Sequence, residues 1–286
     1  MVLAPEIGGA IAALSVGGRD VLRPAPLGST DVLQMACFPL APFANRIAGG
    51  RFSFGGREVR LAPNMGDHPH PLHGQAWLEA WTPEAQGADH ATLRFGYPGG
   101  DWPWAYDAVQ SFKLAGGGLT AQLTVTNRAD EPAPIGLGFH PYFPNKAGAR
   151  LTADLAGVWL ADALCVPTRH VDGLPLGDWR AGGALERGEL VDHCHTGWNG
   201  RAEIGWPGQG VRLELTASPP MRWLHIYAPP WEDFFCVEPV SHRPDALNAP
   251  DPVAEGVRLL APGEACSLSM ALEVVSSQLA IEPARY

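Results

Sequence analysis

The chain has 286 residues, which is long enough to bury a sizeable core without disulfide or metal cross-links. Lys and Arg total 20 against 30 Asp and Glu, giving a formal net charge of −10. A surface of this sign repels phosphate backbones and anionic lipids, so we expect neither nucleic acid nor membrane partners. The 34 glycines and 28 prolines are spread along the chain, which indicates many turns rather than a disordered tract.

The cysteines form no pattern typical of a disulfide framework or a zinc ribbon. They number five, and no CxxC pair occurs, so a cytoplasmic location is expected. The N-terminal residues lack the basic segment of a signal peptide. No apolar run approaches the roughly 18 residues that a membrane-spanning helix needs.

Most apolar segments alternate with a period of two, which predicts β-strands. Residues 51–61 come first, as two short strands joined by Gly55-Gly56, because glycine adopts the positive φ that a two-residue hairpin needs. Further strands are predicted, in chain order, at Thr92–Tyr97, Leu119–Thr126, Val211–Ala217, Leu224–Ala228 and Cys266–Val274. No apolar period of 3.6 persists over three turns, so helices should be few and short. The pattern favours one all-β domain, an antiparallel sandwich or barrel spanning residues 1–286.

Three histidines lie close together in His68-Pro-His70-Pro-Leu-His73. An HxH pair with a third histidine nearby is a metal-binding pattern of cupin-type sandwiches. However, prolines interrupt the strand that such a site needs, and no carboxylate follows at short spacing. We therefore expect His68 and His70 to be structural, hydrogen-bonded histidines without a metal. A metal-dependent, cupin-like enzyme is the alternative.

Two titratable residues lie within apolar segments. Glu238 ends the strand Phe234-Phe-Cys-Val-Glu-Pro, where burial would raise the pKa of its carboxyl and make it a better base near neutral pH. The alternative, which spacing alone favours, is a structural glutamate salt-bridged to Arg243. His140, in Gly-Phe-His-Pro-Tyr-Phe, is by itself more typical of a hydrogen-bonded core histidine. Arg46 by itself is an ordinary surface arginine.

Taken together, the order of these segments resembles the aldose 1-epimerase (mutarotase) family over roughly residues 4–275. The matching pieces are Asn45-Arg46 with the Phe52–Val59 hairpin, Leu72-His73-Gly74 with Trp77, His140-Pro-Tyr142-Phe143, Leu190-Val-Asp192-His193, and Val237-Glu238 with Pro244-Asp245-Ala-Leu-Asn248. The resemblance implies a large antiparallel β-sandwich of the galactose mutarotase-like type, with a sugar cleft on one face. It also implies an isomerase that acts on a free monosaccharide without a cofactor, as a monomer or homodimer.

The same resemblance implies a role for three titratable residues. Glu238 would be the general base and His140 the general acid, while His73 would bind near the ring oxygen and assist. Interconverting α and β anomers requires removing the proton of the C1 hydroxyl while protonating the ring oxygen. The ring then opens, the C1–C2 bond rotates, and the steps reverse. A carboxylate and an imidazole do this without a covalent intermediate.

For substrate binding, the resemblance implies that Arg46, with Asn45, and Asp192 hydrogen-bond sugar hydroxyls, and that Tyr142 lines the cleft. Many relatives carry Asp-His-x-Phe where this chain has Asp192-His193-Cys194-His195. We therefore expect a polar wall in place of an aromatic one. Of the ten tryptophans, we expect one or two to touch the ligand.

Two alternatives belong beside this hypothesis. A sugar-binding or sensor protein without catalysis could use the same fold, although a pure binder needs no matched acid and base. A hexose-6-phosphate 1-epimerase would need two or more additional cations in the cleft to bind the dianion, and the chain has only Lys113 and Lys146 as lysines. The sequence leaves the sugar, the oligomeric state and the protonation of His140 open.

Overall fold

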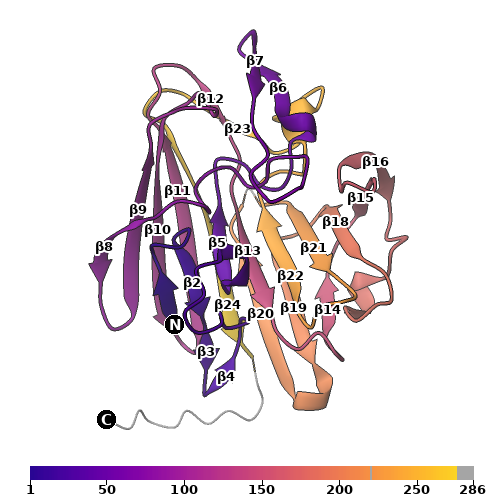
Figure 1. Cartoon of the computed structure of the whole chain (residues 1–286). Helices are drawn as coiled ribbons and strands as arrows, with labels where there is room; N and C mark the ends of the chain where they lie inside the picture. Colours follow the sequence, from indigo (N-terminus) through magenta and orange to yellow (C-terminus); the bar gives the residue numbers. More distant parts are fainter. Residues whose placement is uncertain (220, 276–286) are drawn as a thin grey trace.

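Two large antiparallel sheets make up most of the molecule (Figure 1). The computed structural model describes residues 1–219 and 221–275. The first sheet, called the site sheet here, consists of β1 (Val2–Ala4), β2 (Ala10–Ala13), β5 (Cys37–Leu40), β13 (Gly138–Phe143), β22 (Phe235–Val240), β21 (Trp223–Ala228), β18 (Val191–Thr196), β15 (Gly157–Ala161) and β16 (Pro167–Asp172), in that spatial order. It brings together strands from the first residues of the chain and strands as late as β22.

The second sheet, called the support sheet, packs behind the site sheet. It consists of β17 (Gly183–Ala184), β14 (Arg150–Ala153), β19 (Arg201–Trp206), β20 (Val211–Ala217), β24 (Ala265–Val274), β11 (Gly118–Asn127), β10 (Tyr106–Ala115), β9 (His90–Tyr97) and β8 (Thr82–Gln86). Three short antiparallel pairs complete the described strands: β3 (Ser15–Val16) with β4 (Arg19–Asp20), β6 (Arg51–Phe54) with β7 (Arg57–Arg60), and β12 (Ala133–Ile135) with β23 (Arg258–Leu260).

The predicted elements and the predicted fold class are confirmed. The hairpin at residues 51–61 is β6 and β7, and the five predicted strands fall within β9, β11, β20, β21 and β24. Helices in the described residues are 3₁₀ turns of three residues each, at Val32–Gln34, Ala48–Gly50, Trp179–Ala181, Pro207–Gln209 and Ala246–Asn248. Across the described part of the chain, none is long and apolar enough to cross a membrane.

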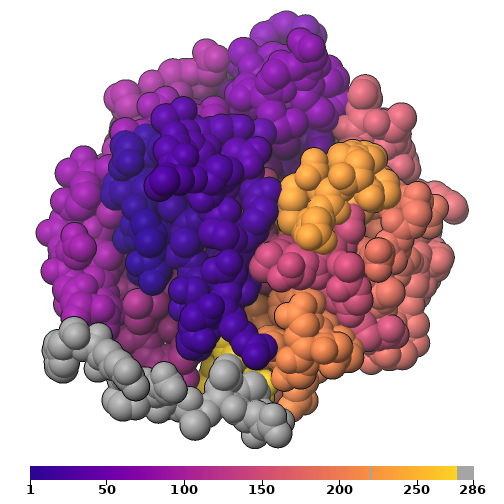
Figure 2. Space-filling view, turned by 60° about the horizontal axis from the view of Figure 1, so that its bottom comes forward, coloured from indigo at the N-terminus to yellow at the C-terminus, as the bar shows by residue number. Residues whose placement is uncertain are grey.

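The hydrophobic core lies between the two sheets because successive residues of a strand face opposite sides. On β13, Phe139 and Phe143 point into this core, where they join Phe235 of β22. The intervening His140 and Tyr142 point to the opposite face. That face is also buried, because segments from the first quarter of the chain cover part of it. Figure 2 shows these segments in indigo and violet, spread over one side of the molecule beside orange segments from late in the chain.

One covering segment approaches β5 so closely that only glycine fits at a key position. Gly74 has φ +73°, and a Cβ added to it would lie 2.3 Å from Pro42 Cδ and 2.4 Å from the Ala41 carbonyl oxygen. The neighbouring Ala76 N–H donates a hydrogen bond to the same Ala41 oxygen at 3.2 Å. This backbone-to-backbone packing fixes the position of His73, which immediately precedes the glycine.

We expect Gly74→Ala to lower the free energy of unfolding by about 2–4 kcal/mol, because it combines an unfavourable left-handed φ with a steric clash. Gly116→Ala is the matched control, since Gly116 has φ +60° and nothing within 4 Å of its added Cβ. The control should lose only the conformational part, about 1–2 kcal/mol. Urea unfolding curves measure both losses. Equal losses in the two variants would contradict the close-packing argument.

Candidate active site

A row of polar side chains crosses the site sheet from β13 to β18. In the β21–β22 ladder His225 lies directly opposite Glu238, and in the β18–β21 ladder Cys194 lies opposite His225. The pairs Gly138–Val240 and Tyr142–Cys236 bracket the β13–β22 ladder, so His140 faces Glu238 from the other side. Directly paired residues share a face of the sheet. The register therefore gathers one carboxylate and two imidazoles from strands far apart in sequence.

Glu238 and His140 form the central pair, with 3.4 Å between Glu238 Oε1 and His140 Nε2. Both are buried, at 2% and 7% exposed. Burial raises the pKa of the Glu238 carboxyl to about 7, and burial lowers the pKa of His140 to about 3, because both environments disfavour the charged form. The shift favours the neutral form of His140 in the free protein.

Aromatic rings pack against His140. The rings of Phe38 and Tyr142 stack on the imidazole at centroid distances of 4.7 Å and 4.8 Å. His73 approaches edge-on, with its ring centroid 5.3 Å from that of His140. Such packing fixes the imidazole plane, so His140 presents Nε2 toward Glu238 in a defined orientation.

His73 is held by the backbone of the loop that precedes β6. Its Nδ1 accepts a hydrogen bond from the Asn45 N–H at 2.9 Å, which places the ring proton on Nε2 in the neutral form. Burial lowers the pKa of His73 well below its usual value, and the nearby His140 adds to this effect. The side chain is 4% exposed. His73 therefore offers a neutral N–H donor beside the central pair.

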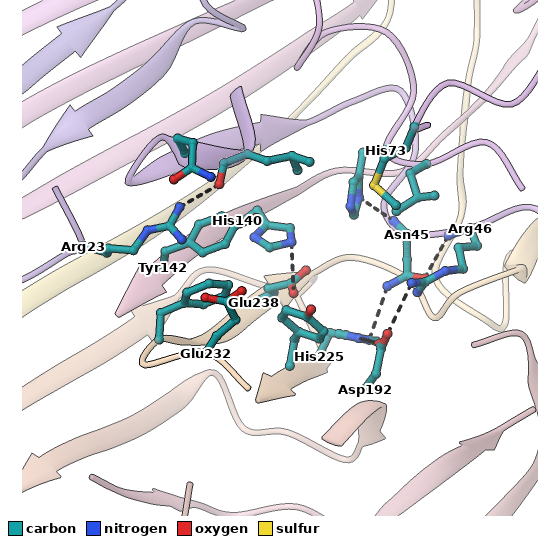
Figure 3. A pocket seen from close by; sticks show the side chains of 16 residues that line it. Arg23, Asn45, Arg46, His73, His140, Tyr142, Asp192, His225, Glu232 and Glu238 are labelled. Carbon is teal, nitrogen blue, oxygen red and sulfur yellow. Dashed lines mark hydrogen bonds and ion pairs between the residues drawn. The ribbon is translucent and has the colours of Figure 1, made fainter. Parts of the chain in front are cut away.

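Next to the central pair lies a network built around Asp192. Arg46 Nη2 donates to Asp192 Oδ2 at 3.2 Å, and His225 Nε2 donates to Asp192 Oδ1 at 2.6 Å. Asn45 Oδ1 accepts from both the backbone N–H and Nη1 of Arg46, at 2.9 Å and 3.1 Å. Figure 3 shows these residues together on one side of His140 and Glu238.

Asp192 is ionised in this network. Burial opposes ionisation, but the hydrogen bond from His225 and the charge of Arg46 outweigh it and hold the pKa of Asp192 well below its usual range. The same hydrogen bond raises the pKa of His225, again against the effect of burial. The Arg46 charge is thus matched by a carboxylate inside the site. Arg46 is 9% exposed, so the expectation of an ordinary surface arginine is wrong.

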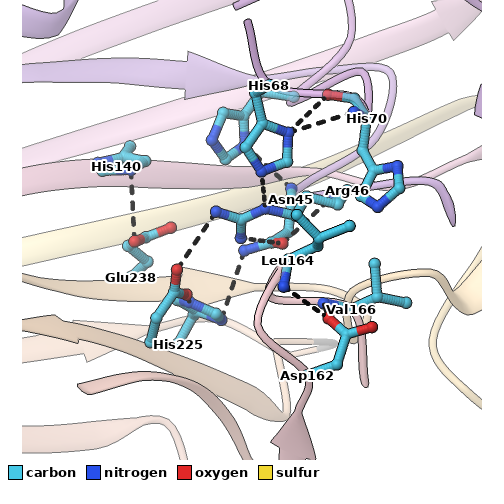
Figure 4. Close-up of polar contacts among 12 residues, drawn as sticks. Asn45, Arg46, His68, His70, His140, Asp162, Leu164, Val166, His225 and Glu238 are labelled. Atoms are coloured by element: carbon cyan, nitrogen blue, oxygen red, sulfur yellow. Dashed lines mark hydrogen bonds and ion pairs between the residues drawn. The ribbon is translucent and has the colours of Figure 1, made fainter. Parts of the chain in front are cut away.

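The other two histidines of the HxH motif support Arg46 and its loop. His68 Nε2 accepts from Arg46 Nε at 3.3 Å (Figure 4), and His70 Nδ1 accepts from the Gly49 N–H at 3.1 Å. These contacts confirm that His68 and His70 are hydrogen-bonded structural histidines. A different group, His140, Cys236 and Glu238, has potential ligand atoms within 4.8 Å of one another. Burial raises the pKa of the Cys236 thiol well above its usual value.

A cleft of about 330 Å³ opens over these groups, a volume at the lower end of the range for small-molecule sites. All seven residues that the resemblance selected line it: Asn45, Arg46, His73, His140, Tyr142, Asp192 and Glu238. Nine further residues also line it: Arg23, Leu33, Gln34, Met65, Leu72, His225, Tyr227, Glu232 and Phe234. The structure therefore brings together every predicted site residue.

The structure corrects the alternative interpretation of Glu238. Arg243 Nε pairs with Glu255 Oε2 at 2.9 Å, and its guanidinium lies 4.2 Å from the ring centroid of Trp159. Glu238 has no arginine partner among the described residues. The alternative expectation of a salt bridge between Glu238 and Arg243 is therefore wrong.

Two expectations about the cleft walls are also wrong. His195 lies on the core face of β18, where its Nε2 accepts from Trp179 Nε1 at 3.1 Å, because the alternation that turns Asp192 to the cleft turns His195 away. Among the described residues no tryptophan lines the cleft. The aromatic walls are Tyr142, Tyr227 and Phe234.

The sequence analysis missed His225, although the signal was present. The strand Leu224-His225-Ile226-Tyr227-Ala228 alternates, and its apolar members Leu224, Ile226 and Ala228 fill the core. A period of two therefore places His225 and Tyr227 on the opposite face. Arg23 and Glu232 come from loops and had no such signal.

Replacing Asp192 should test the network. In Asp192→Asn the Arg46 guanidinium stays buried without its counter-charge, so we expect the free energy of unfolding to fall by about 3–5 kcal/mol. The control is Glu203→Gln, which breaks the exposed 3.6 Å pair with Arg212 and should cost less than about 1 kcal/mol. Both values follow from urea unfolding. If Asp192→Asn lost no more unfolding free energy than the control, the buried Arg46–Asp192 ion pair would not be stabilising as expected.

Two nine-stranded antiparallel sheets with a polar cleft on one face correspond to the galactose mutarotase-like fold. A family model described as aldose 1-epimerase matches residues 1–273. The chain belongs to the aldose 1-epimerase family.

Individual relatives agree with this assignment. YphB of Escherichia coli K12, an uncharacterized protein, is 34% identical over 275 residues, which is 93% of each chain. The solved structure of an aldose 1-epimerase candidate from E. coli K12 aligns with a TM-score of 0.89 and 34% identity, over 96% of this chain and 94% of that one. A galactose mutarotase-like protein from Clostridium acetobutylicum aligns with a TM-score of 0.83 over 96% and 91%; at 20% identity it shows the fold alone.

Proposed function

We propose that the protein is an aldose 1-epimerase that interconverts the α and β anomers of a free monosaccharide. The observation that carries the proposal is the central pair, a buried carboxyl and a buried imidazole 3.4 Å apart at the floor of a cleft. Their pKa values are displaced in opposite directions, to about 7 for Glu238 and about 3 for His140. Paired titratable groups with separated pKa values are the usual arrangement for acid and base catalysis.

In the proposed mechanism the pair exchanges one proton with the sugar. Glu238, as carboxylate, takes the proton of the C1 hydroxyl, and His140, as imidazolium, gives a proton to the ring oxygen. The bond between C1 and the ring oxygen breaks, and C1 becomes an aldehyde carbon. The C1–C2 bond of the open chain then rotates, and the reverse proton transfers close the ring. With a Glu238 pKa of about 7 and a His140 pKa of about 3, about half of the free protein at pH 7 carries one proton on the pair, and that proton resides on Glu238. The 3.4 Å contact lets it move to His140 to give the working form.

The rest of the cleft would position the sugar. Ionised Asp192 accepts hydrogen bonds from hydroxyls, while Arg46 and Asn45 donate from the same side. His73 offers its Nε2–H near the ring oxygen, and Tyr142 forms a wall. Each contact is of the polar kind that small-molecule sites use to fix orientation. We infer that such a sugar-converting enzyme works in the cytoplasm, as a monomer or homodimer.

Anomer equilibration tests the proposal directly. Freshly dissolved α-glucose, α-galactose and pentose anomers are followed by optical rotation with and without the protein, and the 6-phosphates are run beside them. We expect faster equilibration of at least one free sugar than in buffer. If the protein accelerates the equilibration of none of these sugars, the epimerase proposal is wrong and the alternative of a non-catalytic sugar-binding protein is favoured.

Replacing the base should separate catalysis from binding. Glu238→Gln keeps the shape and hydrogen-bonding capacity of the side chain but cannot accept the proton, so we expect kcat to fall by about 10²–10⁴-fold. Sugar affinity, measured by calorimetric or NMR titration, should stay measurable. A variant that epimerises as fast as the parent would show that Glu238 is not the base.

The pH dependence follows from the proton count of the pair. The reaction needs one proton on Glu238 and His140 together. The pair takes up this proton as the pH falls through the Glu238 pKa of about 7, and a second one near the His140 pKa of about 3. We therefore expect kcat/KM to be flat between about pH 3 and pH 7 and to fall up to tenfold per unit above pH 7, after subtraction of the spontaneous rate. A kcat/KM that rises through pH 7 would instead mean that the carboxylate acts without a protonated partner.

The phosphorylated-sugar alternative is disfavoured by the charges in the cleft. A phosphate dianion is typically bound by more than one cationic side chain. Of the two arginines that line the cleft, Arg46 is already paired with Asp192 at 3.2 Å. Arg23 is the remaining cleft arginine among the described residues.

A further inference from the structure

Arg23 is a cation held in place at one end of the cleft. Its guanidinium carbon lies 4.2 Å from the ring centroid of Tyr142 and 4.5 Å from that of Phe234. Nη2 donates to the carbonyl oxygens of Leu33 and Met35, at 2.6 Å and 3.3 Å. Four contacts from three segments fix the orientation of one half-buried side chain, so little conformational entropy is left to lose on binding a ligand.

The charge of Arg23 is not matched inside the protein. Among the described residues Arg23 takes part in no ion pair, and its Nε is buried without a hydrogen-bond partner. The Arg23 guanidinium contacts neutral carbonyl oxygens and aromatic ring faces. Glu232 lines the same end of the cleft, but it is exposed to solvent, where water and salt screen its charge. Arg23 thus differs from Arg46, whose carboxylate partner is buried beside it.

The strand order aligns Arg23 with a particular part of the sugar. His140, Glu238, His225 and Asp192 follow one another on β13, β22, β21 and β18. In the proposed mechanism His140 addresses the ring oxygen and Glu238 addresses C1, so C2 extends toward Asp192. C5 is bonded to the ring oxygen on the side away from C1. Figure 3 shows Arg23 and Tyr142 on the His140 side, opposite Asp192 and Arg46.

We propose that Arg23 forms a subsite for the singly charged C6 carboxylate that a hexuronic acid carries on C5, so that hexuronic acids are preferred over the corresponding hexoses. This inference rests on the proposed epimerase function. One unmatched guanidinium suits one negative charge, whereas a phosphate dianion would need a second cation. A hydrogen bond to a charged partner is stronger than one to a neutral hydroxyl, so the carboxylate gains more than the CH₂OH group of a neutral hexose.

The test compares two matched pairs of substrates, glucuronate with glucose and galacturonate with galactose. In each pair the ring hydroxyls are identical and only the group on C5 differs. For the parent protein we expect a higher kcat/KM for the uronate in at least one pair. In Arg23→Gln the uronate-to-hexose ratio should fall about 10- to 100-fold, the range for losing a hydrogen bond to a charged group.

The uronate-to-hexose ratio is insensitive to a folding defect. A smaller fraction of folded Arg23→Gln protein lowers both apparent kcat/KM values by the same factor. Arg23→Lys serves as a second variant; it keeps the charge without the planar fork, so its ratio should lie between those of the parent and Arg23→Gln. Glu232→Gln is the opposite-charge control, and its ratio should not fall. A ratio that Arg23→Gln leaves unchanged, or that Glu232→Gln lowers, would overturn the subsite.

A binding measurement keeps this inference separate from the proposed function. Glucuronate and glucose are titrated into the parent and Arg23→Gln, with saturation-transfer NMR as the readout. Weaker binding of glucuronate alone in Arg23→Gln supports the subsite even if no anomers are interconverted, in which case the epimerase proposal fails by itself. Equal glucuronate binding by the two proteins would overturn the subsite while leaving epimerase activity on neutral sugars intact.

Discussion

The register of β13, β22, β21 and β18 is the constraint on which the site depends. These strands place His140, Glu238, His225 and Asp192 on one face because their residues alternate between faces in phase across three ladders. A slip of one residue in any ladder would turn the polar members of that strand into the core. The core residues on the same strands, such as Phe139, oppose such a slip because they would lose their packing between the sheets. The hydrophobic core therefore fixes the positions of the polar groups.

Burial from both sides then sets the chemistry. The support sheet lies behind the site sheet, and the first quarter of the chain covers part of its front. Because Gly74 has no side chain, the segment that carries His73 can lie directly against the backbone of Ala41. In this dry environment the pKa of Glu238 lies above that of His140, whereas free glutamate and histidine side chains have the opposite order. The fold thus reverses the usual order of two ordinary acid–base groups without any unusual residue.

Much of the fold could be predicted from the sequence, because period-two alternation and glycine turns are local signals. The pairing of strands is not local: β13 pairs with both β5 and β22, and no spacing along the chain reveals this. The resemblance supplied the seven site residues, whereas residue-by-residue reasoning had assigned Glu238 to Arg243. Arg23 escaped prediction because its position depends on where a loop meets Tyr142 and Phe234 in space. His195 lies on the core face rather than in the cleft wall, because the alternation of β18 turns it away from Asp192.

The distribution of charge gives the cleft a direction. At the β18 end the positive charge of Arg46 is matched by Asp192 at 3.2 Å, and His68 supports the guanidinium from behind. Such a matched end offers donors and acceptors to neutral hydroxyls without attracting a net charge. At the Arg23 end the guanidinium rests on aromatic faces, which stabilise a cation but do not neutralise it. Under the proposed function, a sugar entering this cleft would meet the Arg46–Asp192 ion pair at one end and the unmatched charge of Arg23 at the other. Because Glu238 and His140 lie between these two ends, the asymmetry would orient the ring relative to them before any proton moves.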